Sequence, residues 1–163
     1  MDLKTADINI KTVEEKEELE NYLELLEESV FKKDGFAQAL KDNVPVKYSS
    51  FIKELLDKNK VNLSDGESVK SAFDGLRSYL KNLIPINLTI AYSPSEKSLE
   101  NIYNWVFKNI GENIILDIDI DSGLLGGAII TYKGLYGDYS FKKALEEGFE
   151  EHSEEIEKLL TSI

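Results

Sequence analysis

The sequence predicts an α+β protein, in which an N-terminal helical bundle over residues 1–84 precedes a small C-terminal βαββα domain over residues 85–163. Two observations predict this class. Apolar residues recur at helical spacing throughout the first half, whereas after Pro85 they alternate with polar residues at the two-residue period of a strand. Helices that each have one apolar face bury those faces against one another. We therefore expect two domains that meet near residue 84.

The composition excludes several kinds of function. The chain has 163 residues, no cysteine and one histidine, with 31 acidic against 19 basic residues and a formal net charge of −12. Disulfides, thiolate metal sites and thiol catalysis are excluded, as is a multi-histidine metal site. The negative field disfavours nucleic acid and anionic lipid as direct ligands and favours basic partners. Without a membrane span or the apolar core of a secretory signal, we expect a soluble cytoplasmic protein.

The first predicted helix begins at Thr12, because Thr12-Val-Glu-Glu15 has the spacing of a capping box. Its apolar stripe consists of Leu19, Tyr22, Leu23, Leu26 and Val30. Its opposite face is acidic and carries Glu17, Glu20, Glu24, Glu27 and Glu28. We expect that face to contact solvent. A short helix over residues 36–41 then ends before Pro45, because the residue that precedes a proline leaves helical geometry.

Two further helices complete the predicted bundle. Ser50 is the expected N-cap of a helix over residues 51–60, in which Ile52 faces inward. A second capping box, Ser64-Asp-Gly-Glu67, opens a fourth helix that ends before Pro85. The apolar stripe of the fourth helix consists of Val69, Ala72, Phe73, Leu76, Leu80 and Leu83.

The second half predicts three strands and two helices. The strands are expected at about 86–92, 113–121 and 126–132, with a helix opened by residues 93–98 between the first two. A strand, a helix and a strand in this order indicate a parallel crossover. The second and third strands are close enough in sequence to pair antiparallel. A long final helix is expected from Ser140 to the end. Its stripe consists of Phe141, Leu145, Phe149, Ile156 and Leu160.

The stretch DIDIDSGLLGG, residues 117–127, is the strongest candidate for a metal site. A calcium loop requires glycine at position six and glutamate at position twelve. Counted from Asp117, those positions hold Ser122 and Ala128. Aspartates two apart on a strand are about 7 Å apart, so their short side chains do not converge on one ion. A metal at the bent end near Asp121 remains an alternative.

A solvent-facing row of aspartates is the better interpretation on energetic grounds. Burying Leu116, Ile118 and Ile120 on the opposite face contributes about 1.5–3 kcal/mol each. Repulsion between neighbouring aspartates in water costs roughly 0.6 kcal/mol. Burial therefore outweighs repulsion, and we expect the carboxylates of Asp117, Asp119 and Asp121 to point outward.

The glycine pair at the end of this stretch does not match a phosphate-binding loop. Such loops place glycines before a helix whose N-terminus holds the anion. Gly126-Gly127 instead leads into the strand-like AIITY. Glycines at the start of a strand allow a bulge or a close approach of another backbone segment, which is what we expect here.

Other candidates for chemistry have simpler structural interpretations. His152 lies on the apolar stripe of the last helix and is expected to be packed or at the boundary of the core. Asp138 and Ser140 precede that helix and are residue types that cap helices. Trp105 is expected to be a core or interface aromatic. We therefore expect no catalytic, cofactor-binding or metal-binding residue.

Residues 114–145, IILDIDIDSGLLGGAIITYKGLYGDYSFKKAL, resemble the C-terminal signature of the delta subunit of F-type rotary ATP synthases, the family of the mitochondrial oligomycin-sensitivity-conferring protein. That signature is an apolar strand, a short Asp-Xaa-Xaa turn, Leu-Xaa-Gly-Gly, a second apolar strand and an Asp-Xaa-Ser that opens a helix. Its family-signature structural residues correspond here to Leu124, Gly126, Gly127, Asp138 and Ser140. The resemblance covers most of residues 34–145 and is most specific over the last third.

The resemblance implies a non-catalytic stator subunit in the peripheral stalk. The helical domain would bind N-terminal segments of the alpha subunits of the catalytic head, and the C-terminal domain would engage the end of the b-subunit stalk. The subunit would then resist the torque of the rotor. It would lie at the cytoplasmic face of the cell membrane as a peripheral part of the complex, with no cofactor, no nucleic acid and no direct insertion into the bilayer.

Four features depart from the family pattern. The helix with an Arg-Xaa-Tyr-Ala pattern is not found in residues 1–10, so the bundle is about one helix short. Lys133-Gly134 replaces an aspartate in the turn of a hairpin, and Lys142 and Lys143 take the place of arginines. The acidic tail over residues 146–163 is longer than expected. These differences concern contacts rather than the fold.

Other functions compete with the stator interpretation. A peripheral-stalk subunit of an archaeal or vacuolar-type ATPase would begin with a very long uninterrupted helix, which Pro45 and Pro85 disfavour. A small metal-dependent enzyme would use Asp117, Asp119 and Asp121. An adaptor domain unrelated to ATP synthases is the third alternative.

Overall fold

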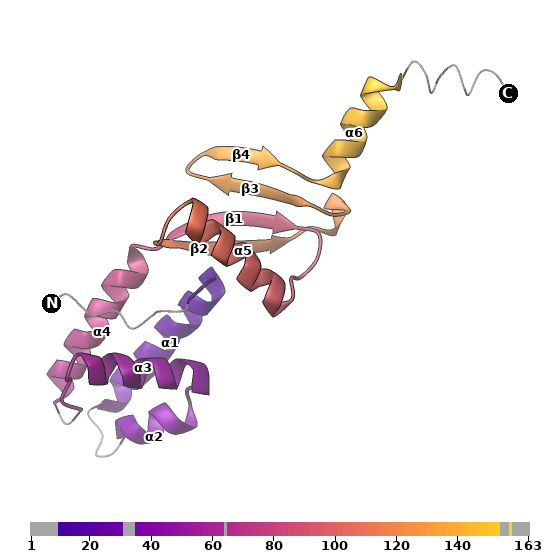
Figure 1. Cartoon of the computed structure of the whole chain (residues 1–163). Helices are drawn as coiled ribbons and strands as arrows, with labels where there is room; N and C mark the ends of the chain where they lie inside the picture. The colour runs from indigo at the N-terminus through magenta and orange to yellow at the C-terminus, as the bar shows by residue number, and fades with distance from the viewer. Residues whose placement is uncertain (1–9, 31–34, 64, 154–156, 158–163) are drawn as a thin grey trace. The chain divides into compact units, whose positions relative to one another are not determined.

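The computed structural model describes residues 10–30, 35–63, 65–153 and 157 (Figure 1). The chain divides into two compact units, Met1–Ile84 and Pro85–Ile163. The first contains four described helices, and the second contains a four-stranded sheet with two helices. The predicted α+β class, with a helical part before a sheet-containing part, is confirmed. None of the described helices is both long and apolar enough to cross a membrane.

The helices of the first unit are α1 (Val13–Val30), α2 (Gly35–Asp42), α3 (Val46–Lys58) and α4 (Gly66–Lys81). Helix α1 contacts both α2 and α4, and α2 contacts α3. All four contribute to a buried apolar core, which is why helices with one apolar face each form a bundle. The largest fully buried side chains here are Leu19, Leu23, Leu26, Ile52, Leu55, Val69, Phe73, Leu76 and Leu80.

Side-chain caps fix the starts of two helices. Thr12 Oγ1 accepts the backbone N–H of Glu15 at 3.1 Å, which confirms the predicted cap of α1. The Glu15 carboxylate accepts the N–H of Lys11 at 2.7 Å, one residue earlier than in a standard capping box. Helix α4 is capped by Asp65, whose side chain accepts the N–H of Glu67 at 3.2 Å. Ser64, the cap predicted for α4, lies outside the described residues.

The predicted start of the third helix is wrong. Helix α3 begins at Val46, with Pro45 at the N-cap position, and Ser50 lies inside the helix. The first helical bond runs from the N–H of Ser49 to the carbonyl of Pro45 at 2.9 Å. Proline suits a helix start because its φ, here −54°, is already close to the helical value and the first N–H groups need no partner. Pro45 therefore ends one helix and starts the next.

The second unit contains β1 (Ile84–Ile90), α5 (Glu96–Asn109), β2 (Ile114–Ile120), β3 (Ala128–Tyr132), β4 (Leu135–Asp138) and α6 (Phe141–Glu151). The strand order is β2-β1-β3-β4. Strands β1 and β2 run in the same direction and are joined through α5, as predicted for a crossover (Figure 1). Strand β3 is antiparallel to β1, and β4 is antiparallel to β3.

The predicted pairing of the second and third strands is wrong, because β1 lies between β2 and β3. After β2 the chain turns through a 3-10 helix, η1 (Ser122–Leu124), and the N–H of Asp121 bonds the carbonyl of Ile90 at 2.9 Å. The chain thus passes the end of β1 and returns on its other side. Tyr92, predicted in the first strand, lies beyond β1 and is exposed.

Strand β4 is not among the strands that alternation predicts, although the resemblance places the turn of a hairpin at Lys133-Gly134. It pairs with β3 through a two-residue turn, Lys133-Gly134, with φ angles of 48° and 79°. Two positive φ values are the mark of the type I′ turn that favours tight hairpins. The apolar pattern of LYGD is too short and too irregular to indicate a strand by itself.

The core of the second unit lies between α5 and the sheet. Its buried residues are Ile86, Val106, Ile114 and Leu116, and Leu99, Ile102, Tyr103, Ile118, Ile130 and Tyr132 pack against them. Burial decreases along β2, so that Ile120 is 50% exposed and its predicted burial is wrong. Strand β2 lies at one end of the strand order, where its last residues have a sheet neighbour on one side only.

Candidate functional site

The five family-signature residues lie around one corner of the second unit, where η1, the start of β3 and the start of α6 meet. Leu124 is buried at the end of η1. The Asp121 carboxylate begins η1 by accepting the N–H of Gly123 at 2.8 Å. Leu125 then adopts a left-handed conformation with φ of 61°, which turns the chain toward β3. We call this region, from Asp121 to Gly127 together with Asp138 to Phe141, the signature corner.

The glycine pair permits a close contact between two backbone segments. A Cβ on Gly127, where φ is 75°, would lie 2.2 Å from the carbonyl oxygen of Tyr139. A Cβ on Gly126 would lie 2.6 Å from a ring carbon of Phe141. The segments are joined by two backbone bonds, from the N–H of Tyr139 to Ala128 at 2.8 Å and from the N–H of Phe141 to Gly126 at 3.0 Å. The predicted close backbone approach is confirmed.

Asp138 and Ser140 shape the start of α6. Asp138 Oδ1 accepts the N–H of Ser140 at 2.9 Å, and Ser140 Oγ accepts the N–H of Lys143 at 3.2 Å. Ser140 is therefore the N-cap, as its residue type predicted, and it is buried. The hydrogen bonds from Ser140 hold the pKa of the Asp138 carboxyl below its ordinary value. The corner thus fixes the position and direction in which α6 leaves the sheet.

The three aspartates of β2 and η1 serve separate purposes. Asp117 is half-buried and accepts a hydrogen bond from the amide of Asn87 at 2.7 Å, whereas Asp119 is exposed. Asp121 is occupied with the N–H of Gly123. Within residues 10–30, 35–63, 65–153 and 157, no group of three or more His, Cys, Asp or Glu side chains could hold a metal ion. The aspartates do not form a common site.

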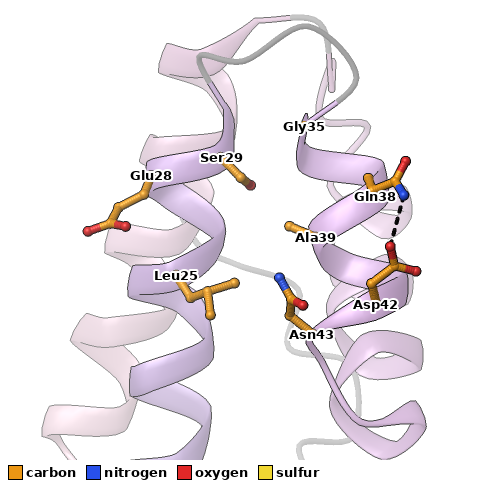
Figure 2. Close-up of a pocket in the computed structure, with 8 residues that line it drawn as sticks. All are labelled: Leu25, Glu28, Ser29, Gly35, Gln38, Ala39, Asp42 and Asn43. Atoms are coloured by element: carbon orange, nitrogen blue, oxygen red, sulfur yellow. Dashed lines mark hydrogen bonds between the residues drawn. The ribbon is translucent and has the colours of Figure 1, made fainter.

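The first unit has a groove between α1 and α2 with a volume of about 320 Å³. In Figure 2, Leu25 and Ser29 of α1 point across it toward Ala39 and Asn43 on the α2 side. Its other lining residues are Glu28, Gly35, Gln38 and Asp42. The amide of Gln38 donates to the Asp42 carboxylate at 2.9 Å. The groove is small, and most of its lining residues are polar, although the Glu28 carboxylate points away from α2 (Figure 2). We call it the α1–α2 groove.

Sequence reasoning did not find this groove, because its lining comes from two elements whose relative positions no periodicity gives. Leu25 is a signal of it in the sequence, because this leucine lies outside the predicted apolar stripe of α1. In the structure its side chain is 37% exposed. An apolar residue beside the buried stripe of an amphipathic helix widens the apolar surface beyond what the core requires.

The acidic face of α1 is not wholly solvated, so this prediction is wrong for Glu27. Arg77 of α4 forms two hydrogen bonds with the Glu27 carboxylate, at 2.7 and 3.0 Å. Glu18, also on α1, accepts the hydroxyl of Tyr48 at 2.7 Å. Burial and this bond raise the pKa of Tyr48, and the bond with Glu27 raises the pKa of Arg77. These contacts join α1 to α3 and α4 through side chains.

The second unit exposes large apolar side chains. Trp105 is 59% exposed on α5 and is therefore not a core residue. Helix α6 buries none of its residues. It ends at Glu151, and His152 is exposed at the C-cap rather than packed in a core. Ile156 and Leu160, predicted to continue its stripe, lie outside the described residues.

The fold places the chain in the α+β class of proteins, with a helical unit before a mixed-sheet unit. The sequence profile of the family described as ATP synthase delta (OSCP) subunit matches residues 4–150, most of the chain. The chain belongs to this family, and the predicted resemblance to the delta subunit family is confirmed.

Relatives named ATP synthase subunit delta agree with this assignment. Those of Thermotoga petrophila and Thermotoga maritima are each 27% identical over 79 residues, which is 48% of this chain and 43% of theirs. That of Wigglesworthia glossinidia brevipalpis is 26% identical over 113 residues, 69% of this chain and 63% of its own. The chain spans less than two thirds of the length of these relatives.

Among solved structures, a chain of the Toxoplasma gondii mitochondrial ATP synthase hexamer covers 83% of this chain and 86% of its own length. Its sequence identity is 12% and the TM-score is 0.35. A score of this size does not establish a common fold.

Proposed function

We propose that the chain is a non-catalytic stator subunit of an F-type ATP synthase, which links the catalytic head to the b-subunit stalk and resists rotor torque. The observation that carries this proposal is the family match over residues 4–150, which includes the whole signature corner. The partners would be the alpha subunits of the head and the b subunit. The chain would take part in ATP synthesis as a peripheral protein at the cytoplasmic face of the cell membrane.

Two surfaces in different units support a linking role. The first unit offers the α1–α2 groove, which is lined by Leu25 and Ala39 together with polar residues that include Asp42. The second unit offers the exposed side of α6. A linker needs two binding surfaces, and the net charge of −12 suits basic partner segments. Electrostatic complementarity of this kind raises association rates and excludes wrong partners.

The backbone contacts of the signature corner suit a component that carries load. The two bonds from Tyr139 and Phe141 to the start of β3 hold α6 against the sheet without relying on flexible side chains. A substituent at Gly127 would separate these segments. A force applied to α6 would therefore be passed to the sheet by main-chain atoms.

The proposal is tested by binding. The purified full chain is titrated in a calorimeter with a peptide of the alpha-subunit N-terminus and, separately, with a C-terminal fragment of the b subunit. We expect a Kd below about 100 μM for each, or roughly −5.5 kcal/mol. If neither binds in this range at physiological salt, the chain is not a stator subunit of this type.

A matched pair of variants assigns the first contact to the α1–α2 groove. Leu25→Glu places a charge between the two helices, and Leu63→Glu places the same charge on another exposed leucine of the first unit. We expect Leu25→Glu to weaken binding of the alpha peptide at least tenfold and Leu63→Glu to leave it within about twofold. Equal effects would mean that the peptide binds elsewhere.

A further inference from the structure

Both walls of the α1–α2 groove are attached to a third helix, α4, whose described residues are not among those that line the groove. On α1, the Glu27 carboxylate accepts two hydrogen bonds from the Arg77 guanidinium, at 2.7 and 3.0 Å. On α2, the buried ring of Phe36 packs against the ring of Phe73, with their centroids 6.3 Å apart. Phe73 and Arg77 are four residues apart and therefore lie on the same side of α4. One side of α4 thus holds both walls.

The contact with Arg77 is made on the side of α1 that faces away from the groove. Each residue advances about 100° around an α-helix, so Ser29 lies within about 40° of Leu25. In Figure 2 both of these side chains point across the groove. Glu27 is two residues after Leu25 and lies about 200° around the helix from it. Arg77 can therefore act on the groove only through the position of α1.

The hydrogen bonds from Arg77 restrain a motion that the apolar core restrains weakly. The fully buried side chains of α1 are Leu19, Leu23 and Leu26. Apolar contacts are non-directional, so they hold α1 close to its neighbours but oppose its rotation about its own axis much less. A paired contact between a guanidinium and a carboxylate is planar and directional. The side chains of Arg77 and Glu27 are only 25% and 24% exposed, which limits their freedom to follow such a rotation.

The contact of α1 with α3 provides a natural comparison. Glu18 of α1 accepts the hydroxyl of Tyr48 at 2.7 Å. Glu18 is seven residues before Leu25, which places it about 10 Å away along the helix axis. Glu27, in contrast, lies between Leu25 and Ser29 in the sequence and is therefore at the level of the groove. Loss of the contact with α3 should leave the groove intact.

We propose that Arg77 is a positioning residue: by holding Glu27, it sets the rotation of α1 and so determines how the side chains of α1 line the α1–α2 groove. The consequence for binding rests on the proposed function, which makes the alpha-subunit peptide the probe. Control of the groove is thereby assigned to a residue that contacts no ligand.

The form of the groove can be measured without a partner. The chain has no cysteine, so Glu28→Cys with Gln38→Cys places one spin label on each wall. A rotation of about 30° moves side-chain ends on a helix about 10 Å in diameter by roughly 2–3 Å. We expect Arg77→Ala to shift or broaden the distance distribution between the labels by this amount, and Tyr48→Phe to leave it unchanged. An unchanged distribution in Arg77→Ala would overturn the proposal.

Binding of the alpha peptide gives a second measurement in which charge and position have opposite effects. Loss of Arg77 makes the chain more negative, so electrostatics alone predicts tighter binding of a basic peptide. Positioning instead predicts that Arg77→Ala weakens binding about fivefold. Arg77→Lys should recover part of this loss, because it keeps the charge but not the paired bonds. Tyr48→Phe is the control and should stay within about twofold. Equal or tighter binding by Arg77→Ala would contradict the positioning role.

A double-mutant cycle separates the paired bonds from the packing of the arginine stem. If Arg77 acts through Glu27, Arg77→Ala should change peptide affinity less than about twofold in a chain that already carries Glu27→Ala. Effects that multiply independently would mean that the stem of Arg77 shapes the groove without Glu27, and would overturn the proposal.

The outcomes separate this inference from the proposed function. If the wild type does not bind the alpha peptide, the head contact of the proposed function fails, and the label distances still decide whether Arg77 positions α1. If the wild type binds and Arg77→Ala changes neither affinity nor distances, the positioning role is wrong and the stator role stands. Should Arg77→Ala unfold, Arg77→Lys carries both measurements with the same direction of change expected.

Discussion

Helices α4 and α6 have the same sequence pattern but opposite surroundings. Each begins at a side-chain cap, Asp65 for α4 and Ser140 for α6, and each has an apolar row at helical spacing. The row of α4, which includes Phe73, is fully buried. The row of α6, which includes Phe149, is more than half exposed. An apolar row therefore predicts a face that binds something, but it does not show whether the partner belongs to the same chain.

The most sensitive test of the difference between α4 and α6 is to replace one phenylalanine in each helix with alanine. Phe73→Ala should lower the free energy of unfolding by about 3–5 kcal/mol, because it leaves a cavity in the core of the first unit. Phe149→Ala should change it by about 0.5 kcal/mol or less, because the ring is 63% exposed. Urea unfolding followed by circular dichroism measures both. A large loss for Phe149→Ala would mean that the isolated chain covers α6 with one of its own segments.

Two glycines with similar positive φ angles test the signature corner that holds α6. Gly134→Ala should cost roughly 1–2 kcal/mol, since φ is 79° and the surrounding space is empty. Gly127→Ala has a similar φ of 75° but also meets the carbonyl of Tyr139. It should cost roughly 2–5 kcal/mol in total, because overpacking adds to the left-handed strain. Equal unfolding midpoints for the two variants would mean that the corner relaxes and does not position α6.

The side-chain contact between α1 and α4 should make a smaller contribution. Arg77→Ala removes both hydrogen bonds to Glu27 and should cost about 1 kcal/mol, a modest value because both side chains are about one quarter exposed and solvent screens them. Arg77→Lys should recover only part of this loss, since lysine cannot form the paired bonds. Unfolding in low and high salt measures the effect, and an identical loss for both variants would show that packing of the arginine stem dominates.

The smallest expected effect is a change in titration at the start of α6. The pKa of Asp138 should lie below that of an ordinary aspartate, and Ser140→Ala should raise it, because Ser140 supplies the hydrogen bonds. A carboxyl whose pKa is lower in the folded chain stabilises the fold above its unfolded pKa, and this contribution is lost as the pH falls through the folded pKa. The loss is therefore confined to pH below about 4. Carbon-13 NMR of the carboxyl measures it, and an unchanged pKa in Ser140→Ala would contradict the assignment.

The sequence predicted the helices and some of their starts, because these depend on the pattern of neighbouring residues. Periodicity predicted the helices of the first unit, and cap residues predicted the starts of α1 and α6 at Thr12 and Ser140. The N-cap preference of serine predicts a start at Ser50, whereas α3 begins after Pro45, because proline fits the first turn of a helix. Alternation does not predict strand β4, because its four residues are too few to show it, and the hairpin turn at Lys133-Gly134 is indicated by the resemblance alone.

Features that depend on distant segments were not predictable in the same way. Strand β1 lies between β2 and β3 because of the direction in which the chain turns after Asp121. The alternation of apolar residues does not predict that direction. The candidate site was predicted in part. Its glycines were expected to permit a close backbone approach, but the segment that approaches, Tyr139 to Phe141, is identified only by the folded structure. The exposure of α6 and the α1–α2 groove likewise depend on which surfaces the rest of the chain leaves uncovered.

The central place of β1 has a consequence for the order in which the protein is synthesised. Strand β1 emerges first from the ribosome, yet both of its hydrogen-bonding edges are covered only by strands that come later, β2 on one side and β3 on the other. Until β3 has emerged, the apolar strand has an unpaired edge of the kind that joins neighbouring nascent chains into aggregates. A chain that stops soon after residue 121 should therefore be insoluble when expressed, whereas one that continues past β4, which pairs with the other edge of β3, should not.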